Sequence, residues 1–467
     1  MEAIIRELGA LKEADIELKP LTIFIGENST GKTWAAYLLS AILSSYGFKR
    51  YFIAYLKDNE HLHSYSAIDD VIGKFLVEGN SKLDIVQFFN DFGESYFNDV
   101  ASLARDWMKS FMATKENPFE NLSIEFKLKN KEEILEALLN YSVDESSASI
   151  DKDKGLRAVK EKGENFLYFY TEDPDIKDKM PIRSINAYIT EAIFATMHIS
   201  AYPGVFFFPV ERTFFGSITI IKQMQDEENN FEKFKYKKRF RIKAHVPLSD
   251  FIDTMIKIEK SGNIDDRVKE ANSENNIIKY LELANILERE VLDGKMEFSN
   301  QGPNLSRELV FKQVTDGKAI ALDLPIVSST VKELSPLVIF LRYEATSRTL
   351  IVIDEPEMNL HPKAQAKIIE FLAMLVNSGL RVLITTHSPY IVDHLVNLIK
   401  ASEHADKEKI KDLFALKSSD AFISRKDVSV YNFAENTAKS ILDEKGFINW
   451  NTFSDISEWT EQLYFEL

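Results

Sequence analysis

The stretch that decides the fold is Leu21–Thr33, LTIFIGENSTGKT. Its first half, LTIFI, is a short apolar run that predicts a buried strand. Its second half, GENSTGKT (26–33), fits the pattern G-x-x-x-x-G-K-[ST], and the apolar run WAAYLLSAIL (34–43) follows at helix length. This pattern should occur by chance in roughly 1–2% of chains this long. Its place between a predicted strand and a predicted helix indicates a phosphate-binding loop.

The residue types in this loop suit a nucleoside triphosphate. The two glycines let the backbone wrap a phosphate group, so that N–H groups from Asn28 to Thr33 converge on its oxygens. Lys32 adds a positive charge at the β- and γ-phosphates, and the Thr33 hydroxyl completes a Mg²⁺ shell. We therefore expect ATP and Mg²⁺ as ligands. The residues expected to contact ATP are Gly26, Asn28, Ser29, Thr30, Gly31, Lys32 and Thr33.

A second motif, LIVIDEP (350–356), places two carboxylates after four apolar residues. The run Thr349–Ile353 predicts a fully buried strand, and side chains at its exit can reach one site. Asp354 is then expected to hold Mg²⁺, mostly through water, and Glu355 to polarise the attacking water. Taken alone, such a pair is usually a solvated turn, but the phosphate-binding loop in the same chain favours the catalytic interpretation.

Two histidines follow these carboxylates. His387 follows a strand-like run in LITTHS (383–388), downstream of the carboxylate pair in the sequence. A neutral imidazole at this position can hydrogen-bond a γ-phosphate or the attacking water. A lone histidine at a strand end is most often structural, but this spacing favours a catalytic role for His387. His361, in EMNLHP (357–362), is expected to shape its turn or to make a subunit contact.

Composition excludes several classes of protein. The chain has 467 residues, which suggests two to three domains. Its net charge of −16 disfavours binding along nucleic acid, so any such contact must come from a local basic patch. It has no cysteine, so disulfides, cysteine-ligated zinc, iron–sulfur clusters and thiol catalysis are excluded. No apolar run is long enough to span a membrane, and the charged N-terminus does not resemble a signal peptide. We therefore expect a cytoplasmic protein that does not contact a membrane.

The loop GENSTGKT (Walker A), the strand ending in DEP (Walker B), the LHP turn and the THS strand end together resemble the ABC-type ATPases of the SMC, RecF and OLD group. The resemblance covers roughly 1–40 and 325–400 strongly, and 200–215 and 290–325 loosely. It implies an α/β fold: a P-loop ABC-type ATPase head with a large, mainly helical insertion between Walker A and Walker B. Within the group the chain is most similar to the ATPase subunit of PARIS phage-defence systems, and next to the Septu ATPase.

The resemblance assigns roles to two further residues. SSTVKEL (328–334) resembles a degenerate signature motif, with Ser329 as the serine that caps the nucleotide of a second subunit, although Thr330 and Val331 replace both glycines. The alternative is an ordinary helix start with serine as N-cap. FPVERT (208–213) resembles an FPxER stretch of these ATPases, in which Arg212 reaches phosphate or a switch carboxylate, or else forms a structural ion pair.

The chain is expected to divide into five regions. These are an ATPase lobe with Walker A (1–44), a mainly helical insertion (45–200), ATPase strands with a basic and helical arm (201–325), the signature-like helix with Walker B and the histidine (326–400), and a C-terminal extension (401–467). The polar segment Ser142–Asp178 predicts an exposed loop. Apolar runs predict strands at Val205–Val210, Lys295–Leu322, Leu380–Ile384 and Val428–Phe433, and helices at Val331–Arg342 and Lys363–Val376.

A basic run marks a possible contact surface. Phe231–Lys243 (FEKFKYKKRFRIK) holds seven basic residues interleaved with aromatic ones. This composition suits nucleic acid, or an acidic protein that mimics it. Alternatively, it forms a solvated edge strand.

The resemblance also predicts partners. Such ATPases complete their active site with a second subunit, which implies a head-to-tail homodimer or a larger assembly. No Asp-x-Asp occurs from Ser388 to Leu467, so we expect no Toprim nuclease in this chain.

The leading hypothesis is an ATP-hydrolysing switch subunit of a bacterial anti-phage complex. It would control a separate Toprim-like or HNH nuclease, with an acidic phage-encoded trigger protein or DNA meeting Lys233–Lys243. The alternatives are a RecF-like DNA-repair ATPase and a scaffold that binds ATP without turning it over.

Overall fold

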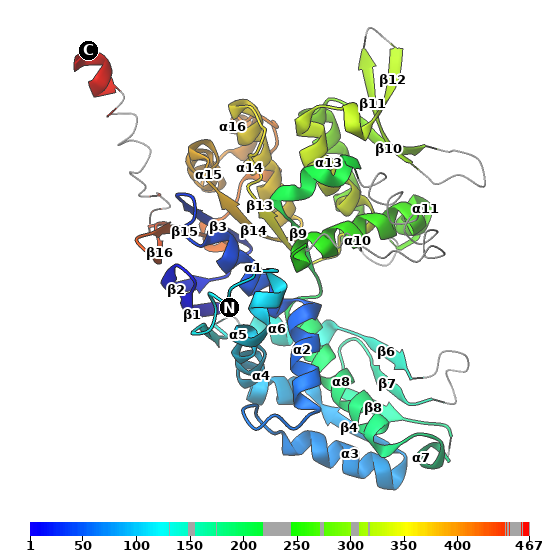
Figure 1. The fold of residues 1–467 in the computed structure, drawn as a ribbon. Helices are drawn as coiled ribbons and strands as arrows, with labels where there is room; N and C mark the ends of the chain where they lie inside the picture. The colour runs from blue at the N-terminus through cyan, green and yellow to red at the C-terminus, as the bar shows by residue number, and fades with distance from the viewer. Residues whose placement is uncertain are drawn as a thin grey trace, which may run out of the picture.

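The computed structural model describes residues 1–129, 131–147, 155–173, 175–217, 244–270, 275–299, 308–315, 318–443, 445, 448, 459 and 461–466. A large sheet with helices on both faces forms one part of the molecule, and most of the segment between α1 and β9 forms a second part beside it (Figure 1). The basic run 231–243 lies outside the described residues.

The main sheet has nine strands in the order β5-β1-β2-β16-β15-β3-β14-β13-β9. The five from β15 to β9 are parallel, and β1 and β2 form an antiparallel hairpin. The strands are β1 (Glu2–Leu8), β2 (Leu11–Glu17), β3 (Leu21–Gly26), β5 (Ser123–Lys127), β9 (Val205–Phe208), β13 (Leu350–Asp354), β14 (Arg381–Thr386), β15 (Val428–Ala434) and β16 (Thr437–Ser440). The predicted strands of the parallel half are therefore present.

Both faces of this sheet are buried, because successive side chains in a strand point to opposite faces. Phe24, Val352 and Leu383 join a core that contains α1 (Lys32–Leu43) and the insertion. Their neighbours Ile353 and Ile384 join a second core beneath the helices of the opposite face. Those helices are α10 (Val246–Ser261), α12 (Asn275–Leu287), α13 (Ser329–Tyr343), α14 (Pro362–Asn377) and α15 (Pro389–Ser402).

The insertion is mainly helical, as expected, but it also holds an antiparallel sheet in the order β4-β8-β7-β6. Its elements are α2 (Ser45–Tyr55), α3 (Ser66–Glu78), β4 (Asn80–Asp84), α4 (Ile85–Ser102), α5 (Ala104–Phe111), α6 (Lys131–Asn140), β6 (Val143–Ser146), β7 (Arg157–Lys160), β8 (Phe166–Tyr170), α7 (Ile176–Lys179) and α8 (Ile182–Ala201). The prediction of an exposed loop over Ser142–Asp178 is wrong where the chain is described. Ala158, Leu167 and Phe169 alternate with more exposed residues and are buried, so these short strands have a core face.

Smaller elements complete the fold. The strands predicted over Lys295–Leu322 form an antiparallel sheet. They are β10 (Lys295–Ser299), β11 (Glu308–Thr315) and β12 (Lys318–Asp323), and the short helices are η2 (Val210–Ser217), α11 (Ile264–Glu270), η3 (Glu288–Leu292), η4 (Leu324–Ile326), α16 (Lys407–Ile410), η5 (Lys411–Leu413), η6 (Ser419–Ala421) and η7 (Arg425–Asp427). No helix in the described ranges is both long and apolar enough to cross a bilayer.

The C-terminal region is not an extension outside the main sheet, so the predicted boundary at 401 needs correction. Strand β15 pairs in parallel with β3, the strand before the phosphate-binding loop, and β16 joins β15 to β2. Val428 and Val430 are fully buried, and the Glu17 N–H donates a 2.7 Å hydrogen bond to the Tyr431 hydroxyl. Residues 428–440 are therefore central strands of the sheet.

Candidate active site

The site forms at one edge of the main sheet. Strands β3, β14 and β13 are parallel neighbours, and their carboxyl ends lie together because Asp354 pairs with Thr385, and Thr386 with Ile25. The phosphate-binding loop, the acidic pair and His387 each follow one of these strands. Topology therefore brings together three motifs that lie far apart in the sequence.

The backbone of the loop has the conformation that anion binding requires. Ser29 and Gly31 have positive φ angles of 63° and 96°, and no described side chain caps the N-terminus of α1. The N–H groups of its first turn are thus available to a phosphate. A Cβ atom on Gly26 would lie 2.3 Å from the Phe433 carbonyl oxygen of β15, so this position accepts only glycine without a shift of the backbone.

Lys32 is a buried cation at the base of the loop. Its Nζ donates to the Gly26 carbonyl at 3.0 Å and also to the Glu27 carbonyl. Burial lowers the pKa of Lys32 to about 8, although the carboxylates of Glu355 and Asp354 oppose this shift. A phosphate placed here would favour the charged ammonium further.

Thr33 and Asp354 provide a fit for Mg²⁺. The Thr33 hydroxyl donates to Asp354 Oδ1 at 3.0 Å, and the Thr385 hydroxyl donates to the same oxygen. Asp354 is buried, and burial raises the pKa of its carboxyl. No group of three or more His, Asp or Glu side chains in the described chain could hold a metal by itself. A metal here would take its other ligands from phosphate and water.

Glu355 and His387 lie beside this pair. Glu355 Oε1 is 3.3 Å from His387 Nε2, and both side chains are about one-third exposed. The hydrogen bond to His387 lowers the pKa of the Glu355 carboxyl. Glu355 has a φ of 49°, a left-handed conformation that is uncommon outside glycine. This turn at the strand exit lets consecutive residues, Asp354 and Glu355, serve one site.

Glu357 was not predicted, and it orients the histidine segment. Its Oε1 accepts 2.7 Å hydrogen bonds from the Thr386 hydroxyl and from the His387 N–H. Burial raises the pKa of the Glu357 carboxyl. The sequence marks Glu357 only by its position two residues after Glu355. A glutamate in a loop after a strand is often exposed to solvent, so this position alone does not indicate a role.

Arg212 forms a buried ion pair, which is the second of the two alternatives that the sequence left open for it. Its guanidinium is buried, lies 2.9 Å from Glu333 Oε2, and donates to the carbonyls of Asp354 at 2.6 Å and Glu355 at 2.7 Å. Glu333 belongs to α13 and also accepts from the Asn359 side chain. Arg212 therefore joins α13 to the end of β13.

The structure places Ser329 at the start of α13. Ser328 is the N-cap of α13 and accepts a hydrogen bond from the Val331 N–H at 3.3 Å, which is the helix start considered above. Ser329 follows as an exposed first residue of the helix. His361 is the N-cap of α14 and accepts a hydrogen bond from the Lys363 N–H. It therefore shapes its turn, which is one of the two roles predicted for it.

Residues 2–392 match a family described as the AAA ATPase domain. The chain belongs to this family. It is also 38% identical over 78 residues to Old nuclease of Escherichia phage P2, a match that spans 15% of this chain and 13% of that protein. Strands β15 and β16 lie beyond the matched range, yet they complete the sheet of this AAA ATPase domain.

Two crystal structures of Smc heads are distantly similar. One is bound to the C-winged helix domain of ScpA and has a TM-score of 0.34 and 9% identity. The alignment with it covers 94% of this chain and 96% of the Smc head chain. The other, with an extended coiled coil and the C-terminal domain of ScpA from Pyrococcus furiosus, has a TM-score of 0.34 and 10% identity, with coverage of 99% and 98%. Similarity this low supports no inference about the AAA ATPase domain here.

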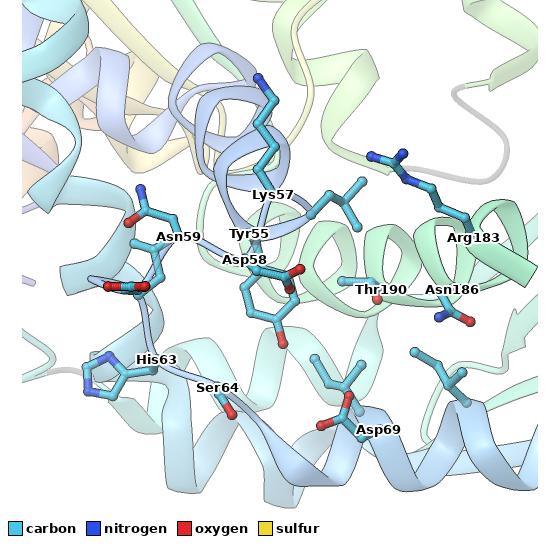
Figure 2. Close-up of a pocket in the computed structure, with 15 residues that line it drawn as sticks. Tyr55, Lys57, Asp58, Asn59, His63, Ser64, Asp69, Arg183, Asn186 and Thr190 are labelled. Carbon is cyan, nitrogen blue, oxygen red and sulfur yellow. The ribbon is translucent and has the colours of Figure 1, made fainter.

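A separate cavity of about 910 Å³ lies in the insertion (Figure 2). Tyr55 at the end of α2, Asp69 of α3, and Asn186 and Thr190 of α8 surround it. It shares no lining residue with the phosphate-binding loop or the Walker B strand. The candidate active site of the AAA ATPase domain is therefore the sheet edge.

Proposed function

We propose that this chain is an Mg²⁺-dependent ATPase. The observation that carries the proposal is the meeting of Lys32, Thr33, Asp354, Glu355 and His387 at one sheet edge. Membership of the AAA ATPase domain family supports it. A cation, a hydroxyl, a buried carboxylate and an exposed carboxylate–imidazole pair are the parts that phosphoryl transfer to water requires.

Each residue has a distinct task in the proposed reaction. Lys32 and the N–H groups of the loop bind the β- and γ-phosphates. Thr33 and Asp354 would hold Mg²⁺, and the bound ion would neutralise negative charge on the phosphates. Glu355, kept ionised by His387, orients the attacking water and accepts its proton. With nucleotide bound, His387 would hydrogen-bond the γ-phosphate or that water.

The substitution Glu355→Gln tests this assignment. Glutamine keeps the shape but accepts no proton, so we expect phosphate release to fall by about 10²–10⁴-fold while ATP binding persists. Phosphate release and equilibrium binding measure the two effects, and Glu132→Gln on α6 is the matched control. Equal rates for wild type and Glu355→Gln would contradict the assignment and favour a scaffold that does not turn ATP over.

The complete site, we propose, includes a second copy of the chain. Ser329 is exposed at the start of α13, which suits a contact with nucleotide on a partner. ATP would then hold a head-to-tail homodimer, or a larger assembly, in its closed state. Sedimentation of Glu355→Gln with ATP should show this dimer, and the additional substitution Ser329→Arg should abolish it.

The biological role that we propose is a cytoplasmic switch in anti-phage defence. The resemblance to PARIS and then Septu ATPases supports it, as does the short similarity to Old nuclease of a phage. The switch would hold or release a separate Toprim-like or HNH nuclease, triggered by an acidic phage protein or DNA at Lys233–Lys243. Purification together with the product of a neighbouring nuclease gene, with and without ATP, tests it. Retention that ignores both nucleotide and Lys32→Ala would contradict the switch.

The basic run also supports a second candidate, a RecF-like ATPase that binds DNA directly. Its seven basic residues and aromatic neighbours suit the backbone and bases of nucleic acid. DNA should then stimulate hydrolysis in a salt-dependent way, and neutralising Lys237, Lys238 and Arg239 should weaken the stimulation. A hydrolysis rate that does not respond to DNA excludes this candidate.

A further inference from the structure

The last ten residues combine aromatic and acidic side chains. The sequence EWTEQLYFEL (458–467) contains three glutamates and no lysine or arginine. Residues 461–466 are helical, and this helix lies apart from the body of the molecule (Figure 1). Trp459, Tyr464 and Phe465 are 59%, 78% and 76% exposed. Three exposed aromatic rings so close together indicate a contact surface, because Trp, Tyr and Phe are enriched at the centres of interfaces. We call residues 459–466 the aromatic tail.

A groove elsewhere on the surface has complementary properties. It has a volume of about 370 Å³ and lies between the C-terminal half of α15 and the segment that follows α16. Phe414 packs against the rings of Phe422, at 4.8 Å, and His394, at 5.7 Å, and forms the apolar base. Leu413 is 82% exposed at the rim. The lining residues are His394, Asn397, Lys400, Ala401, His404, Ile410, Leu413 and Phe414, and we call this feature the α15 groove.

Charge and shape favour the aromatic tail as the occupant. The lining of the α15 groove includes Lys400 and no carboxylate, and its His394 pairs with Glu370 at 2.6 Å. The tail carries glutamates and no basic residue. The groove volume falls within the roughly 300–1,000 Å³ range of ligand pockets. An apolar base beside Lys400 therefore suits an apolar segment that carries glutamates.

We propose that the aromatic tail of one copy of this chain docks in the α15 groove of a second copy. Figure 1 shows the helix of the aromatic tail apart from α15 and α16 of its own chain, and we infer that a second molecule brings the two surfaces together. The contact joins copies through surfaces that contain no residue of the phosphate-binding loop or the Walker B strand. It is thus independent of the proposed ATP-held dimer and can extend a dimer into a larger assembly.

A labelled peptide of residues 456–467 tests recognition. The receptor is the full chain with Trp459→Ser, Tyr464→Ser and Phe465→Ser, which removes competition from its own tail. Fluorescence anisotropy should rise to saturation, and Leu413→Asp in the receptor should weaken binding at least about tenfold. Val77→Asp, at a similarly exposed site in the insertion, should leave binding unchanged. Failure to saturate, or binding that ignores Leu413→Asp, would overturn the proposal.

Energy transfer between two variants distinguishes a second copy from docking within one chain. One variant carries the serine-substituted tail and a donor dye, and the other carries Leu413→Asp and an acceptor dye. Both also carry Lys32→Ala, so that ATP plays no part. Only their mixture holds an intact tail and an intact groove on different molecules, and transfer should appear only there and increase with concentration. If the mixture shows no transfer although the peptide binds, docking occurs within one chain and the proposal is wrong.

Discussion

Arg212 connects three segments with one buried side chain. It pairs with Glu333 of α13 and donates to the carbonyls of Asp354 and Glu355, so it supports the backbone on which the acidic pair lies. Burial raises the pKa of the Glu333 carboxyl, and the Arg212 charge opposes that shift. The residue thus supports the backbone that carries the two proposed catalytic carboxylates.

Replacing Arg212 should be costly to stability. Arg212→Met leaves a buried carboxylate without its partner, and we expect the free energy of unfolding to fall by about 3–5 kcal/mol in urea titrations. The double variant Arg212→Met/Glu333→Leu removes both charges and should recover part of this loss. If the losses of the two single variants simply add in the double variant, the ion pair is not the source of the effect.

The residues of the candidate site could be predicted where a motif places them next to a strand. Lys32, Thr33, Asp354 and His387 lie within or directly after apolar runs, and the parallel order of those strands brings them together. The partner of Arg212 could not be predicted, because it depends on how α13 packs against the sheet. Glu357 was missed because its bond to the His387 N–H is a tertiary contact that spacing alone does not reveal.

At the scale of elements, α8 fixes the end of the helix that starts at the phosphate-binding loop. His198 of α8 is buried, and its Nε2 lies 3.1 Å from the carbonyls of Leu43 and Ser44 at the end of α1. The Tyr96 hydroxyl lies 2.9 Å from Nδ1. The carbonyls require an N–H at Nε2. Because burial lowers the pKa of His198, the ring is neutral and Nδ1 accepts from the tyrosine.

This contact should make stability depend on pH. Burial lowers the pKa of His198 from 6.5 to about 4, so below pH 6.5 the unfolded chain binds a proton that the folded chain does not. The contribution of His198 is therefore complete above pH 6.5 and is lost as pH falls toward 4, by about 3 kcal/mol in all. Denaturant titrations at pH 7 and pH 4 of wild type and His198→Gln measure it. A stability difference between the two proteins that stays constant with pH would contradict the prediction.

Strands β15 and β16 make a second prediction at this scale. A chain that ends at Ser402 lacks both strands and leaves β3 and β2 without their neighbours inside the sheet. We expect it to show no cooperative thermal unfolding by circular dichroism. A chain that ends at residue 443 keeps both strands and should unfold close to the wild-type temperature. Equal cooperativity in the two chains would show that the sheet does not need its C-terminal strands.

Elements were predicted best where an apolar run is continuous. The parallel strands of the sheet are buried on both faces, so TLIVI and LRVLI were visible in the sequence. The run at Val428–Phe433 predicted a strand, but its place beside β3 depends on a pairing across about 400 residues. Strands β7 and β8 were missed because only one of their faces is buried, and polar residues flank them.

The whole molecule places the proposed ATP site at the edge of a sheet whose strands come from both ends of the chain. The insertion packs on one face of that sheet and α13 on the other, while Arg212 ties α13 to the acidic pair. We propose that a change at the nucleotide reaches the surface that bears Ser329 through this contact. The proposed switch depends on this path, and the path depends on ATP binding at Lys32.

ATP affinity of the variant Lys32→Ala is the most direct test. Calorimetric titration with ATP and Mg²⁺ should show a loss of affinity of about 10- to 100-fold, because a charge-assisted contact to phosphate contributes about 1.5–3 kcal/mol. Lys74→Ala on α3 is the matched control, and thermal unfolding verifies that both variants are folded. A folded Lys32→Ala variant that binds ATP as tightly as wild type would contradict the site proposed for this chain.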